Sequence, residues 1–423
     1  MVQKSSTAAW TMGGLFVTIY ITNFLLAWPI TRWSGISNGS FLFGDFSWLS
    51  KWSTDCRLDP SLPNLLSIYS QLENSPTCPG FNYGMALLLL LSIFPVSWGS
   101  YISLALIVGV FAVFYIGFFL GRSYLMTSWQ KVLATVTFFS PGAFLLFERG
   151  NLDLVIFLLI ILASAFLGRG HYTPAYLILV LATLLKFYAL PLVLFVALLS
   201  RTWKQRVITV ASTIVICVWV LVDLSRGPIL PIQGSVQFGY PVLNHYFEWL
   251  GLRLAPLPDL IGFLSPLIVW ITLILIQRRA GADQQSNLSQ GTKALQGDYA
   301  FMFSGITFCA MFFVGLSYDY RLVFLAVAGI ALIVRGTFDG KIRVALWISL
   351  IIALWGSGAL GNSLMFIPTE IKPFLIGGFQ LAGDLAVILW VGILLHFGSS
   401  VVAQKIKWFG KLHAFITRTK GEK

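Results

Sequence analysis

The feature that most constrains the fold is a series of apolar runs, most of them about as long as a membrane-spanning helix. A helix needs roughly 20 apolar residues to cross the bilayer core. The runs cover residues 10–29, 101–121, 131–147, 152–168, 173–200, 207–223, 260–277, 300–316, 321–335, 344–361 and 374–396. Only 10% of the residues are charged, whereas a soluble domain has about 25%. The sequence therefore predicts an all-α polytopic membrane protein.

One run, at residues 173–200, is too long for a single straight span and contains Lys186 and Pro191. We divide it into two short helices that meet at the membrane surface, which gives about twelve spans. The first run, at 10–29, lacks a small-residue cleavage site, so we read it as a span and not as a signal peptide.

The orientation depends on Tyr83–Trp98, an apolar stretch interrupted by Pro95. It could be a span or a helix at the membrane interface. The interfacial reading places most Lys and Arg on the cytoplasmic side, as the positive-inside rule requires. Under that reading Glu148 and Asp153 face outward. The net charge of +12 then reflects loop residues near anionic lipid, and not a nucleic-acid partner.

No motif of a soluble enzyme is present: there is no glycine-rich phosphate loop, HExxH, GxSxG or DxD. No cysteine spacing suggests zinc, although Cys56 and Cys78 share one long loop and could form a disulfide outside the cell. Any chemistry must then use isolated charged groups. Asp45 could be a general base, or an ordinary loop acid or helix cap.

Three other places combine polar groups with apolar surroundings. Asn151 and Asp153 could be functional, or could be the N-cap and first turn of a helix. Lys186 needs an anion or a path to the interface, because charge at membrane depth is costly; snorkelling is one explanation and a lipid phosphate the natural partner. The Ser317–Arg321 junction could bind substrate or form a salt-bridged turn. His245 has only its titration near neutral pH in favour of a functional role.

Four short motifs, taken in order along the chain, resemble a known family. Asp45 follows the first span, and Ser140-Pro141 precedes Arg149-Gly150-Asn151-Leu152-Asp153. Leu185-Lys186-Phe187-Tyr188 precedes Pro191, and Ser317-Tyr318-Asp319-Tyr320 follows later. This order resembles polyprenyl-phosphate-sugar-dependent glycosyltransferases of the GT-C superfamily, most of all glycosyltransferase family 87, the membrane mannosyltransferase group. The chain departs from that pattern at Phe81-Asn82-Tyr83-Gly84 and near Tyr320, which leaves the sugar and the acceptor open.

The resemblance implies a GT-C type fold with interfacial helices in the first extracytoplasmic loop and an inverting transfer on that face of a bacterial plasma membrane. It implies a polyprenyl-phosphate-sugar donor, a glycan or glycolipid acceptor, contact with membrane lipids, and no cofactor or metal. The expected roles are catalysis by Asp45 and Asp153, binding of the donor phosphate by Lys186, Arg149 and Arg321, and substrate binding by Asn151, Asp319, Tyr320 and His245.

The expected organisation has three parts. Residues 1–206 form a catalytic membrane module that includes the first outer loop, 30–83. Residues 207–398 form a second transmembrane module with an outer loop at 226–259, and residues 399–423 form a basic amphipathic cytoplasmic tail. The alternatives are a secondary transporter, which Asp384 inside the last apolar run would favour, a lipid-linked glycan polymerase or ligase, and a membrane scaffold without activity.

Overall fold

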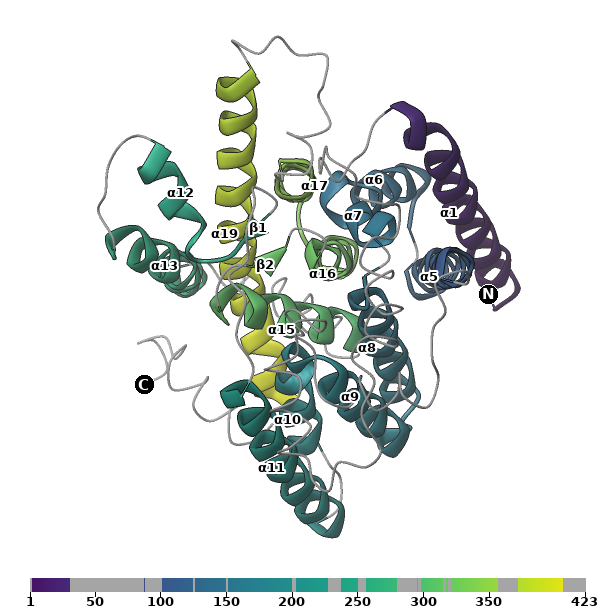
Figure 1. Ribbon diagram of the computed structural model, residues 1–423, viewed down its shortest axis with the longest axis vertical. Coiled ribbons are helices and arrows are strands. Elements are labelled where there is room, and N and C mark those ends of the chain that lie inside the picture. The colour runs from purple at the N-terminus through teal and green to yellow at the C-terminus, as the bar shows by residue number, and fades with distance from the viewer. Residues whose placement is uncertain are drawn as a thin grey trace, which may run out of the picture. The chain divides into compact units, whose positions relative to one another are not determined.

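The computed structural model shows a protein built almost entirely of helices (Figure 1). It describes residues 2–30, 87, 101–124, 126–149, 151–199, 203–226, 237–249, 256–279, 295, 298–314, 317–318, 321–356 and 372–405. The helices are α1 (Val2–Ile30), α5 (Tyr101–Ser123), α6 (Ser128–Phe138), α7 (Pro141–Arg149), α8 (Asp153–Gly168), α9 (Tyr172–Leu185), the 3-10 turn η1 (Phe187–Ala189), α10 (Leu190–Leu198), α11 (Trp203–Arg226), α12 (Val242–Trp249), α13 (Leu257–Arg279), α15 (Tyr299–Val314), α16 (Leu322–Arg335), α17 (Gly340–Trp355) and α19 (Lys372–Lys405). Two short strands, β1 (Gln237–Phe238) and β2 (Ser317–Tyr318), form an antiparallel pair.

Four of the described helices are long and apolar enough to cross a membrane. They include Ser103–Ser123, Trp203–Val222, Leu257–Gln277 and Gly377–Val402. The bent pair α6–α7 could be a fifth span. Other apolar helices are shorter; α8, for example, has 16 residues, or about 24 Å of helix. The long apolar helices fit a membrane protein, as predicted. The count of about twelve spans stays a prediction, and Tyr83–Trp98 lies outside the described residues apart from Leu87.

The run at 131–147 is not one straight helix. Helices α6 and α7 are bent by 64° to each other at Phe139 and Ser140. Pro141 is the first residue of α7, and a proline in a helix interior would remove a hydrogen bond and clash with the preceding turn. The chain therefore restarts the helix at the proline, where the missing N–H is tolerated.

The run at 173–200 divides into two short helices, as predicted. Helix α9 ends at Leu185, and Lys186 has an extended backbone with φ −158° and ψ 128°. The turn η1 and helix α10 follow, with Pro191 in the first turn of α10. The break therefore lies at Lys186, five residues before the proline. Its depth in the membrane stays a prediction.

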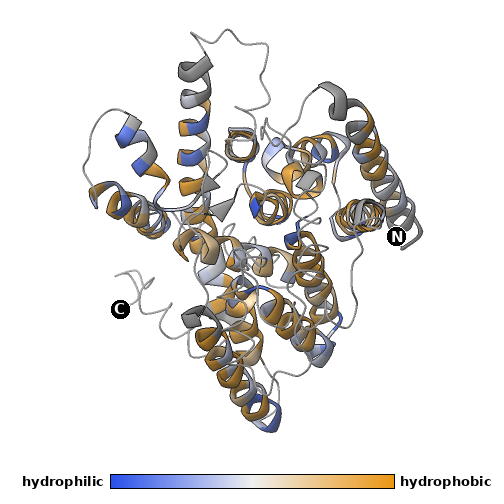
Figure 2. Cartoon of the chain, viewed as in Figure 1, coloured by the Kyte–Doolittle hydropathy of each residue, from blue (hydrophilic) through white to orange (hydrophobic). Residues whose placement is uncertain are grey.

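The chain forms two compact units. Unit 1 comprises Met1–Ser37, Val113–Leu146 and Gly234–Lys423, and unit 2 comprises Asn38–Ala112 and Phe147–Gln233. In unit 1, α16 packs against α6, α15 and α17, and every residue from Leu322 to Ile333 is buried. In unit 2, α9 packs against α8 and α10, and α10 packs against α11. Hydrophobic residues dominate α8 to α11 (Figure 2).

Candidate functional site

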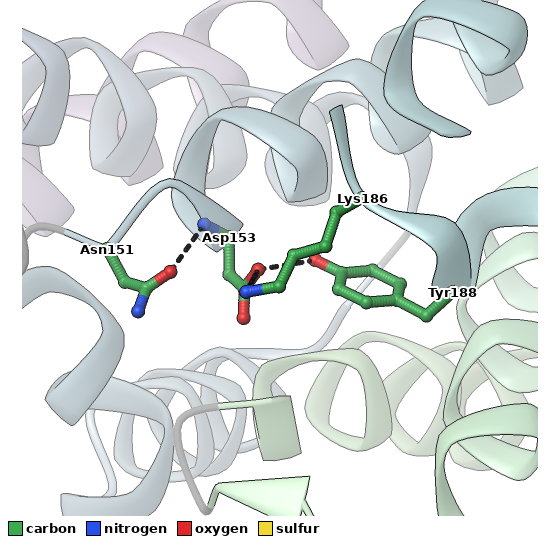
Figure 3. Close-up of polar contacts among 4 residues, drawn as sticks. All are labelled: Asn151, Asp153, Lys186 and Tyr188. Atoms are coloured by element: carbon green, nitrogen blue, oxygen red, sulfur yellow. Dashed lines mark hydrogen bonds and ion pairs between the residues drawn. The ribbon is translucent and has the colours of Figure 1, made fainter. Parts of the chain in front are cut away.

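Two interruptions of helical structure bring four polar side chains together in unit 2. One is the junction between α7 and α8, which supplies Asn151 and Asp153; the other is the break after α9, which supplies Lys186 and Tyr188 (Figure 3). Asn151, Asp153 and Lys186 are buried, and Tyr188 is half-buried. We call these four residues the Lys186 cluster.

Asp153 is the first residue of α8, as expected for an acid in the first turn of a helix. The side-chain Oδ1 of Asn151 accepts a hydrogen bond from the backbone N–H of Asp153 at 2.8 Å. The N-cap position itself is occupied by Leu152 and not by Asn151 as predicted. Asn151 nevertheless satisfies one of the N–H groups that a helix start leaves without an intrahelical partner.

Lys186 forms a buried ion pair with Asp153. Its Nζ lies 2.6 Å from Oδ1 of Asp153, and the exposed fractions of the two side chains are 10% and 1%. The Tyr188 hydroxyl donates a hydrogen bond of 3.0 Å to the same oxygen, and Nζ lies 5.9 Å from the centre of the Tyr188 ring. A lipid phosphate was the predicted counter-ion of Lys186; in the structure Asp153, 33 positions earlier, is a counter-ion within the protein.

The local fold explains why Lys186 can reach Asp153. The extended backbone at Lys186 ends the turn of α9 while its N–H still donates to the carbonyl of Ala182 at 2.9 Å. The 3-10 turn then places Tyr188 beside the same carboxylate. Helices α8 and η1–α10 both begin at this cluster, so the positive ends of their dipoles lie there. The Lys186 ammonium and the Tyr188 hydroxyl therefore meet at one carboxylate, beside the starts of two helical segments.

A second group of polar contacts lies in unit 1, around α12. The Asn244 amide donates to Oδ1 of Asp259 in α13 at 2.5 Å. The Tyr246 hydroxyl donates to Oδ2 of Asp384 in α19, also at 2.5 Å, and Asp384 is buried. We call these four residues the Asp384 cluster. The strand pair that precedes α12 joins it to the Ser317–Arg321 junction, because Gln237 pairs with Tyr318 and Phe238 with Ser317.

The remaining predicted site residues are only partly described. Asp45, Asp319 and Tyr320 lie outside the described residues, as do Cys56, Cys78 and the tail beyond Lys405. For Arg149 and His245 the backbone alone is described, in α7 and α12. Arg321 is half-buried at the N-cap position of α16. Within the part of the chain that the structure describes, there is no group of three or more His, Cys, Asp or Glu that could hold a metal.

Five residues of the two clusters had no predicted role in the transferase site: Tyr188, Asn244, Tyr246, Asp259 and Asp384. Tyr188 belongs to the motif around Lys186, and its position two residues after the lysine, in a broken helix, was the signal for it. Tyr246 and Asp384 lie 138 positions apart, so only the fold reveals that they meet. An acid inside an apolar run was the one signal for Asp384, and it had suggested a transporter.

Long apolar helices fit a membrane protein, and the Lys186 cluster is a buried polar site at two of its helix breaks. Residues 79–229 match the model of glycosyltransferase family 87. The match covers somewhat more than a third of the chain and includes the whole Lys186 cluster. It confirms the resemblance found in the sequence and implies a glycosyltransferase. Neither the search of curated proteins nor that of solved structures gave a match.

Proposed function

We propose that the protein is an inverting glycosyltransferase that uses a polyprenyl-phosphate-linked sugar, mannose or another hexose or pentose. The acceptor is a lipid-linked or cell-envelope glycan, and the reaction takes place on the extracytoplasmic face of a bacterial plasma membrane. The observation that carries this proposal is the buried Lys186–Asp153 pair, which lies within the segment matched by the family model.

The electrostatics of the Lys186 cluster favour an additional anion. Each helix N-terminus is equivalent to roughly half a positive charge, and the charges of Lys186 and Asp153 cancel. The N-termini of α8 and η1–α10 therefore leave the cluster with a positive surplus. A phosphodiester is an anion that fits such a place, because Lys binds phosphate as a compact point charge and helix N-termini bind it through N–H groups.

The donor phosphate would bind the ammonium of Lys186, either beside Asp153 or in its place. Arg149 and Arg321 are the further cations that the sequence motifs assign to the phosphate. Fixed cations stabilise the charge that develops on the leaving group, and this term is usually the largest in such a reaction. Because phosphate leaves readily, the scheme needs no acid catalyst.

The reaction has one proton to remove. The acceptor oxygen attacks the anomeric carbon, the bond from that carbon to the phosphate oxygen breaks, and the phosphate keeps the electron pair. We assign the proton of the acceptor hydroxyl to Asp45 as general base. Asp153 is less suited to that step, because its Oδ1 already contacts Lys186 and Tyr188, so we assign it to charge balance around the phosphate. Attack without an enzyme nucleophile inverts the anomeric centre.

The direct test is an assay of the purified protein in lipid with a panel of polyprenyl-phosphate sugars and glycolipid acceptors. We expect a glycosylated acceptor and an equal amount of polyprenyl phosphate. A preparation that transfers no sugar from any donor in the panel would contradict the proposal, and sugar uptake into sealed vesicles would favour the transporter instead.

A further inference from the structure

The Lys186 cluster already holds an anion at the ammonium that is assigned to the donor phosphate. Nζ of Lys186 contacts Oδ1 of Asp153 at 2.6 Å, and the Asp153 side chain is only 1% exposed. A buried ion pair is costly to break, because each charge then loses its partner without gaining water. The donor can therefore bind this ammonium closely only in competition with Asp153.

The two partners of the pair are held in different ways (Figure 3). Asp153 has a short side chain at the first position of α8, and its backbone N–H donates to Asn151 at 2.8 Å. Lys186 carries its ammonium on a flexible four-carbon stem, and its side chain is 10% exposed. When the pair opens, we therefore expect the ammonium to move and the carboxylate to stay in place.

Tyr188 supports the carboxylate in the absence of the lysine. Its hydroxyl donates to the same Oδ1 of Asp153 at 3.0 Å. The start of α8 adds a second support, because the helix dipole favours an acid in the first turn. Both contacts lower the free energy that is needed to separate Lys186 from Asp153, and both keep the carboxylate where the ammonium can return to it.

The proposed reaction raises the charge of the phosphate that competes for Lys186. The donor is a phosphodiester with one negative charge. Cleavage of its bond to the sugar leaves polyprenyl phosphate, a monoester with a charge of roughly −1.5 to −2 near neutral pH. A fixed cation attracts this product more strongly than it attracts the donor, and product release limits the turnover of many enzymes. An internal anion that competes for the cation would speed this step.

We propose that Asp153 is an internal competitor of the phosphate: it occupies the Lys186 ammonium between turnovers and, by returning to it after transfer, releases polyprenyl phosphate. Tyr188 is the positioning residue that keeps the carboxylate ready for this return. The inference rests on the proposed transferase function and adds to it how the donor site is emptied.

Asp153→Asn tests the competition directly, because the amide can still accept from Tyr188 but carries no charge. An internal competitor lowers the apparent affinity by the fraction of time for which it blocks the site. We therefore expect the Kd for polyprenyl phosphate to fall about tenfold, and the KM for the donor to fall with it. Slow release should also give a burst of about one product per protein before a slower steady rate.

Asp298→Asn is the matched control, because it makes the same change in another buried ion pair, formed with Arg335 at 2.9 Å. It should alter neither the Kd nor the time course. If Asp153→Asn does not fold, Tyr188→Phe tests the inference from the opposite side. It removes a support of the separated carboxylate, so the Kd for polyprenyl phosphate should rise about threefold.

Unchanged or weaker binding of polyprenyl phosphate by Asp153→Asn would overturn the inference, and so would a first turnover as slow as the later ones. A lower Kd in Tyr188→Phe would overturn it as well. A merely structural role of Asp153 predicts weaker binding in the Asn variant, which is the opposite result. Because binding is measured without turnover, a wild-type protein that transfers no sugar would be recognised separately and would overturn the proposed function.

Discussion

The Lys186 and Asp384 clusters stabilise a charged side chain within an apolar run in different ways. Each contains a charged side chain inside an apolar run, and each supplies its partner from a distant part of the chain. In the Lys186 cluster, Lys186 and Asp153 balance each other's charge, and two helix N-termini lie beside them. The net charge of the cluster is therefore positive. In the Asp384 cluster, each carboxylate accepts a hydrogen bond from a neutral donor. The difference supports the assignment of the donor phosphate to the Lys186 cluster.

The largest expected effect comes from breaking the ion pair. Lys186→Met leaves Asp153 as a buried carboxylate without its cation, which should cost about 3–5 kcal/mol of stability. From the sequence alone, the same change would be expected to leave the fold intact, because it removes a charge from an apolar run. Thermal unfolding in detergent measures the difference, and an unchanged midpoint would mean that the pair adds nothing to stability.

The double variant Lys186→Met with Asp153→Asn separates stability from function. It removes both charges and keeps an oxygen that can accept from Tyr188, so most of the stability should return. Donor use should not return, because the cation is still missing. Lys186→Arg is the companion variant and should keep part of the transfer activity, since it keeps the charge but changes its geometry.

Asp45→Asn tests the proton step apart from either cluster. The amide keeps the shape of the carboxylate and removes its basicity, so turnover should fall by about 100-fold or more while donor affinity is unchanged. Turnover is measured with saturating donor and acceptor. Wild-type turnover in this variant would end the assignment, and Asp55 or Asp153 would become the candidate base.

Tyr188→Phe should have a smaller effect within the Lys186 cluster. It removes one hydrogen bond to Asp153 but leaves the ion pair, so we expect a loss of about 1.5–3 kcal/mol in stability, the range for bonds to charged groups. The donor KM should rise by less than in the Lys186 variants. A loss equal to that of Lys186→Met would show that Tyr188, and not the lysine, holds the carboxylate.

The smallest effect is expected at a buried acid that belongs to neither cluster. Asp298 forms an ion pair of 2.9 Å with Arg335, and burial raises the pKa of Asp298 although Arg335 opposes the shift. A raised folded pKa means that the stability contributed by protonation is present in acid and is lost as pH rises through that pKa. Asp298→Asn should therefore lose little stability at neutral pH and leave the KM for the donor and the KM for the acceptor unchanged. A large change in either KM would weaken the assignment of function to the Lys186 cluster.

Local features of the fold could be predicted from the sequence, whereas the contacts of the site could not. A lysine and a proline inside an overlong apolar run predicted the break between α9 and α10. The bend before Pro141 was not predicted, although the proline supplied the reason. The pairing of Lys186 with Asp153 depends on how α8 packs against α9, which a hydrophobic pattern does not specify. Tyr246 and Asp384 meet only because α12 packs on α13 and α13 packs on α19.

Direct binding tests most plainly whether Lys186 recognises the phosphate of the donor. The measurement compares the affinity for a polyprenyl-phosphate sugar with that for the same polyprenol without phosphate, in the wild type and in the Lys186→Met, Asp153→Asn double variant. We predict that the wild type prefers the phosphate form by about tenfold or more, the value of a good charge-assisted bond, and that the double variant has lost most of this preference. An equal preference in both proteins would contradict the account.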